Sequence, residues 1–125
     1  MKTTTTPNNL QSEIYSLIVP QDILENFEVT GVIKREADIT LELTEKPEKI
    51  PKELLGKDVV MNGYLNQLEL QSFPLQGKPT YLRLIRRRWK EQGSVNNTSY
   101  HNEYDFAASG TKSTKDFGLF LKEYL

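Results

Sequence analysis

Basic side chains are concentrated in one short stretch of this sequence, residues 78–90, which contains no acidic residue. Guanidinium and ammonium groups bind phosphate oxygens, and a tryptophan ring can stack on a base or pack beneath an arginine. The stretch is therefore a candidate contact for a nucleic-acid backbone, with weak, salt-sensitive and non-specific binding expected from its arginines. The residues assigned to this candidate DNA-binding site are Lys78, Arg83, Arg86, Arg87, Arg88, Trp89 and Lys90.

The basic residues of this stretch and Trp89 can instead be interpreted as having a structural role. The chain has a formal charge of −1, and the six basic residues of the stretch leave −7 for the rest of the sequence. The arginines could therefore pair with surplus acids, and Trp89 could belong to the core. Exposure separates the two interpretations: guanidinium groups that project together from one face favour DNA binding, whereas pairing of each with Glu or Asp favours an interaction domain.

Two further groups of residues could carry chemistry. The segment 110–114 precedes a predicted helix, so its amides could bind a phosphate with help from Lys112 and Lys115, which we include as weaker DNA-binding candidates. The same segment is also typical of a simple helix cap. His101 lies near Glu103 and could act as a general base, although a surface histidine between tyrosines explains it more simply.

Several classes of site are excluded or not indicated. The chain has no cysteine, which excludes disulfides and a thiolate zinc site, and its single histidine cannot form a metal site without several carboxylates. No serine nucleophile in a recognisable setting and no glycine-rich phosphate loop is present. We therefore expect no catalytic residues, no metal and no cofactor, and we expect that the chain is not an enzyme.

The termini and hydropathy predict the location and domain organisation. No apolar run approaches the roughly 18 residues of a membrane span, and the polar N-terminus lacks the apolar segment of a signal peptide. We expect a cytoplasmic protein without membrane association. Residues 1–9, with four consecutive threonines, are expected to form a flexible tail before a single domain over residues 10–125.

Apolar spacing predicts a helix near each end of the chain. Leu10, Ile14, Leu17 and Ile18 follow helical spacing, and a short helical turn is expected over 21–27. At the other end Ser113 is the expected cap, and the apolar stripe of the helix comprises Phe117, Phe120, Leu121, Tyr124 and Leu125.

The middle of the chain predicts strands. Alternation of apolar and polar residues over 39–44 gives the clearest signal and pairs with 26–34 in a hairpin. Further extended segments are expected over 59–73 and 80–89, around a turn at 74–79, and a last short strand over 100–107. The fold class is therefore α+β, a small antiparallel sheet flanked by N-terminal and C-terminal helices.

The order of these segments resembles the N-terminal region of the ISAon-type insertion-sequence transposases, which is encoded as a separate short open reading frame. The resemblance covers roughly residues 10–125. Its most specific part is Phe-Pro-x-x-Gly-Lys, ending at Lys78, followed nine residues later by Arg-Arg-Trp. The segments that carry it are 17–20 (LIVP), 23–29 (ILENFEV), 71–82 (QSFPLQGKPTYL), 86–89 (RRRW), 108–112 (ASGTK) and 117–123 (FGLFLKE).

The resemblance implies a non-catalytic, DNA-binding part of a transposase of a mobile element, acting in DNA transposition and recombination. Its implied partners are the terminal repeats of the element and a catalytic transposase subunit on a separate or frameshift-fused chain; homo-oligomerisation stays open. The alternative is a protein-interaction or dimerisation domain of the transposase with no direct DNA contact. An inactive remnant is a further alternative.

A more distant resemblance links the same stretch to the N-terminal zinc-binding domain of a larger transposase group. In that group a cysteine of the metal site follows the arginine motif, whereas Lys90 and Glu91 occupy that position here. This chain therefore depends on packing alone, and the DNA contacts of the zinc-binding relatives do not transfer directly.

Overall fold

The computed structural model describes residues 9–96 and 98–124 and confirms the predicted α+β fold with a helix near each end. The expected tail lies, apart from Asn9, outside the described residues. In chain order the elements are α1 (Leu10–Ile18), α2 (Gln21–Leu24), β1 (Phe27–Lys34), β2 (Ile39–Glu45), the 3-10 helix η2 (Lys52–Leu54), β3 (Val59–Tyr64), β4 (Leu68–Leu75), β5 (Lys78–Ile85), β6 (Arg87–Glu91) and α3 (Lys115–Tyr124).

The larger sheet has four strands in the order β1-β2-β5-β4. The predicted hairpin forms between β1 and β2, and β4 and β5 form a second antiparallel hairpin. This second hairpin turns at Gln76 and Gly77, which both have positive φ, a backbone conformation that suits the twist of two-residue hairpin turns. Between the hairpins, β2 and β5 pair in parallel.

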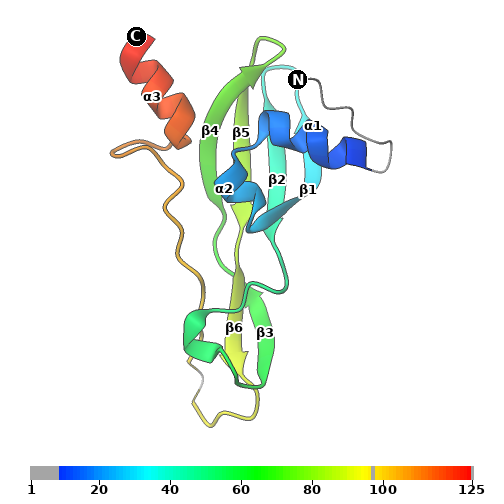
Figure 1. Cartoon of the computed structure of the whole chain (residues 1–125), viewed down its shortest axis with the longest axis vertical. Coiled ribbons are helices and arrows are strands. Elements are labelled where there is room, and N and C mark those ends of the chain that lie inside the picture. The colour runs from blue at the N-terminus through cyan, green and yellow to red at the C-terminus, as the bar shows by residue number, and fades with distance from the viewer. Residues whose placement is uncertain (1–8, 97, 125) are drawn as a thin grey trace, which may run out of the picture.

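The smaller sheet consists of β3 and β6, which pair antiparallel. The segment expected as one strand over 80–89 is divided at Arg86 into β5 and β6, which belong to different sheets. The segment expected over 59–73 is likewise divided into β3 and β4. Figure 1 shows β3 and β6 beyond one end of the larger sheet, along the long axis of the molecule. We call residues 47–64 and 86–101 the small lobe and the remaining described residues the large lobe.

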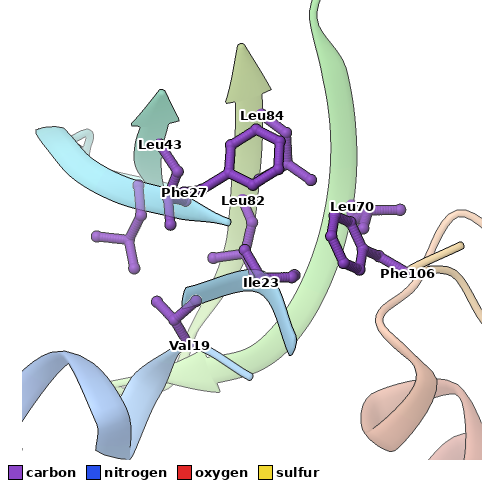
Figure 2. Packing of buried hydrophobic residues seen from close by; sticks show 9 residues of the cluster. Val19, Ile23, Phe27, Leu43, Leu70, Leu82, Leu84 and Phe106 are labelled. Carbon is purple, nitrogen blue, oxygen red and sulfur yellow. The ribbon is translucent and has the colours of Figure 1, made fainter. Parts of the chain in front are cut away.

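The main hydrophobic core covers one face of the larger sheet. Alternate residues of β2, β4 and β5 point to this face, where the segment around α2 and the C-terminal part of the chain cover them (Figure 2). Its buried members are Val19, Ile23, Phe27, Leu41, Leu43, Leu70, Leu82, Leu84 and Phe106.

Two local predictions were wrong. Residues 100–107 do not form a strand but make isolated bridges at Tyr100 and Ala107. The segment between Tyr100 and Ala107 instead places Phe106 in the core. The helix cap is shifted by one residue: α3 begins at Lys115, and the hydroxyl of Thr114, rather than Ser113, accepts a hydrogen bond from Phe117 N at 3.3 Å.

Candidate nucleic-acid interface

Three arginines of the basic stretch lie at the junction of the two sheets. Arg86 stands between β5 and β6, and Arg87 and Arg88 begin β6. All three side chains are half-buried. The structure therefore brings these arginines together but does not present them as fully exposed groups on one face.

Arg87 is held by the end of β2. Its main-chain N–H donates to Glu45 Oε1 at 2.9 Å, and its Nε donates to the Glu45 carbonyl at 2.7 Å. Its Nη1 lies 3.0 Å from Met61 Sδ, and its guanidinium stands 6.0 Å from the ring centre of Tyr64. These contacts fix the Arg87 side chain against β3 and limit its freedom to reach a ligand.

Glu45 is a fully buried carboxylate that sequence reasoning missed. Besides Arg87 N–H it accepts hydrogen bonds from Asn102 Nδ2, at 3.0 Å, and from the Tyr104 hydroxyl. Three donors from two other segments satisfy the charge, as a buried carboxylate requires. A signal was present in the sequence, because Glu45 continues the alternation of Leu41 and Leu43 on the core side of β2.

The Tyr104 hydroxyl belongs to this buried hydrogen-bond network, which changes its pKa. Burial raises the pKa of Tyr104 far above its ordinary value, and the hydrogen bond to Glu45 and the charge of Glu45 raise it further. Asn102 also donates to the carbonyl of Lys49, at 2.7 Å. The network thus joins β2, the start of β6 and the segment after Tyr100, and it ties the small lobe to the large lobe.

Arg88 is anchored in a way that leaves part of its guanidinium free. Its Nε donates to the Asn62 carbonyl at 2.7 Å, and a Cβ atom at Gly63 would lie 3.1 Å from its Nη2. No described residue makes a hydrogen bond or ion pair with either Nη atom of Arg88. Lys90 is half-buried and follows Arg88 on the same side of β6 by strand alternation.

Trp89 belongs to the interior of the small lobe. It is only 7% exposed, pairs across the sheet with Met61, and exchanges main-chain hydrogen bonds of 2.8 and 2.7 Å with Tyr100. Trp89 is therefore a core residue of the small lobe, and its ring is not exposed for stacking on a base.

Arg83 and Lys78 lie apart from this junction, on β5 in the large lobe. Arg83 stands between two carboxylates, with Nη1 3.4 Å from Glu42 and Nε 3.6 Å from Glu69. Lys78 donates to the Arg35 carbonyl at 3.1 Å. The acids on both sides of Arg83 offset its charge, and Lys78 lies at the other end of β5 from Arg86, so the basic residues of the stretch that lie together are those of Arg86–Lys90.

The segment before α3 is folded as a helix cap. The amide of Thr114 donates to the Gln71 carbonyl, the Gln71 amide donates to the Lys112 carbonyl, and the amide of Ser113 donates to the hydroxyl of Thr111. Lys112 is exposed, and Lys115 lies 3.6 Å from Asp105. Because the amides of Ser113 and Thr114 already donate hydrogen bonds within the protein, the donors that this segment has left for a phosphate are mainly the lysine side chains.

Charge is distributed unevenly between the lobes. The small lobe contains seven lysines and arginines and four acidic residues, a formal charge of +3. With −1 for the whole chain, the rest of the sequence carries −4. The two-stranded sheet therefore forms the positive end of an elongated molecule (Figure 1).

His101 is paired with the nearby carboxylate of Glu103. Its Nε2 lies 2.6 Å from Glu103 Oε1, and the other oxygen of Glu103 lies 3.4 Å from Arg86 Nη1. Within residues 9–96 and 98–124, no group of three or more His, Asp and Glu side chains is arranged to hold a metal ion. No helix in the same ranges has the length and apolar character needed to cross a membrane.

Comparison of the chain with models of protein families, with curated proteins and with solved structures gave no match.

Proposed function

We propose that this chain is the non-catalytic, DNA-binding N-terminal region of an insertion-sequence transposase, and that its small lobe contacts the DNA backbone. The observation that carries the proposal is the positive small lobe, in which Arg86, Arg88 and Lys90 lie at the start of and along β6, while the rest of the chain is acidic. The resemblance of the segment order and of the Phe-Pro-x-x-Gly-Lys and Arg-Arg-Trp motifs supports the family part of the proposal.

The anchored guanidinium of Arg88 suits this task. An arginine held through Nε already has a restricted side chain, so it loses less conformational freedom when its Nη atoms grip a phosphate. Lys90 adds a point charge beside it, and Arg87 positions the strand through Glu45. Contacts of this kind fix a protein on the duplex without reading sequence, and their strength falls with salt.

A binding titration of the purified chain tests this function. The DNA would be a terminal repeat of its own element and a scrambled duplex of equal length, each at two salt concentrations. We expect binding to both that weakens with salt, and tighter binding to the repeat if this region reads the ends. Absence of binding to either duplex at low salt would refute direct DNA contact.

The interaction-domain alternative is supported by a separate observation. Leu10, Ile14 and Leu17 of α1 are exposed, and Leu17 is 83% exposed, so the predicted helical stripe lies largely in solvent. Near α3, Phe73 of β4 and Phe120 and Tyr124 of α3 are likewise exposed, although Phe73 and Phe120 pack edge to face against each other. Under this second candidate function, these faces hold the catalytic chain.

Co-expression with the catalytic chain of the same element separates the two functions. Replacement of Leu17 and Phe120 by serine should abolish co-purification if the helices dock that chain, whereas Arg88→Gln should not. The reverse pattern, or equal co-purification of all variants, would contradict docking through these faces.

A further inference from the structure

The guanidinium of Arg86 is incompletely satisfied within the protein. Among the described residues its one side-chain hydrogen bond joins Nη1 to Glu103 Oε2, at 3.4 Å, which is long for a charge-assisted hydrogen bond. Its Nε is buried and has no hydrogen-bond partner within residues 9–96 and 98–124. The Arg86 side chain is 18% exposed. A mostly buried guanidinium with one long contact retains capacity for an anion.

Glu103 differs from Arg86 in exposure. Its side chain is 77% exposed and lies on the segment that leaves the small lobe outside any strand. Its other oxygen lies 2.6 Å from His101 Nε2, and His101 is also outside the strands and the main core, so neither contact of the carboxylate involves the core. The carboxylate can therefore leave Arg86 without disrupting the core.

We propose that Glu103 occupies the position of a DNA phosphate at Arg86 and is displaced when the backbone binds. Carboxylate and phosphate present similar oxygen pairs to a guanidinium, so one can replace the other. The Arg86–Glu103 contact that is lost is long, at 3.4 Å, and the released carboxylate is already largely in water, so a phosphate at Arg86 can compensate for its loss. This inference rests on the proposed DNA contact and identifies Arg86 as one phosphate position and Glu103 as its internal competitor.

Glu103→Gln tests the proposal, because it removes the competing charge while preserving side-chain shape. We expect it to tighten binding to a duplex of arbitrary sequence roughly two- to fivefold at about 0.1 M salt, a modest gain because the competing carboxylate of Glu103 is largely exposed and screened. Glu91→Gln is the matched control, since it removes the same charge from a small-lobe residue that pairs with Lys57 at 3.8 Å.

The double variant Arg86→Gln/Glu103→Gln completes the test. If Glu103 competes at Arg86, the gain from Glu103→Gln disappears in the Arg86→Gln background. Equal gains from Glu103→Gln and Glu91→Gln, or a gain that persists without Arg86, would overturn the inference while leaving DNA binding intact. Absence of DNA binding by the unmodified chain would instead overturn the proposed function, and the inference with it.

Discussion

The two lobes of this molecule are stabilised in different ways. The large lobe buries a continuous cluster of leucine, isoleucine, valine and phenylalanine side chains on one face of a four-stranded sheet. In the small lobe, the hydrophobic residues that are buried are Leu54 and Trp89. An isolated pair of strands is at best marginally stable in water, so the small lobe must depend on its attachments to the large lobe. The buried apolar side chains that stabilise the fold are thus concentrated in the large lobe, whereas the positive charge is concentrated in the small lobe.

Core truncation should show this difference most strongly. Leu82→Ala removes a fully buried side chain from the central strand β5 and should lower the free energy of unfolding by about 3 to 4 kcal/mol. Val60→Ala in β3, where the side chain is 38% exposed, should cost less than about 1 kcal/mol. Urea unfolding measures both. Similar losses of stability in the two variants would contradict the claim that the two lobes are stabilised in different ways.

The buried carboxylate of Glu45 should have the next largest effect. Glu45→Ala leaves the amide of Arg87 and the side chains of Asn102 and Tyr104 without their acceptor, which should cost about 2 to 3 kcal/mol. Glu48→Ala, at an exposed position three residues later, is the control and should change stability little. Equal effects of the two substitutions in urea unfolding would show that Glu45 does not join the lobes.

Tyr104 should give a smaller, pH-dependent effect. Its pKa is raised in the folded protein, so the folded state keeps the neutral hydroxyl where the unfolded chain ionises. The stabilisation is complete below the unfolded pKa of about 10 and is lost as pH rises above it. Tyr104→Phe should cost about 1 to 2 kcal/mol at pH 8, with a difference from the unmodified chain that shrinks toward pH 11.

Denaturant unfolding between these pH values measures that difference. Because the other tyrosines are common to both proteins, their titration cancels in the comparison. A difference that stayed constant across the range would show that the Tyr104 hydroxyl is not coupled to Glu45.

Local sequence signals predicted the large lobe better than the junction. The alternation of apolar and polar residues over 39–44 predicted β2. The predicted turn that contains Gly77 is the connection between β4 and β5. The division of the 80–89 segment at Arg86 was not predictable, because the change of sheet depends on pairing with β2 and β3, which lie far away in the sequence. The assignment of Ser113 as cap failed by one residue, since Thr114 offers the same chemistry.

The candidate site was predictable in composition but not in arrangement. Clustering of Arg86, Arg87 and Arg88 was evident from the sequence, whereas their partners were not. Glu45 lies 42 positions from Arg87 and reaches it only through the fold. The separation of Arg83 from the junction likewise follows from its position between Glu42 and Glu69 on neighbouring strands.

The most direct test of the account compares the salt dependence of DNA binding after equal loss of charge from each lobe. One variant would replace Arg86, Arg88 and Lys90 by glutamine, and the other would replace Lys112, Lys115 and Lys122. Each phosphate contact contributes roughly 0.9 to the slope of log K against log salt. We predict a reduced slope for the small-lobe variant and an unchanged slope for the large-lobe variant. An equal reduction in both, or a reduction confined to the large-lobe variant, would contradict the assignment of DNA binding to the small lobe.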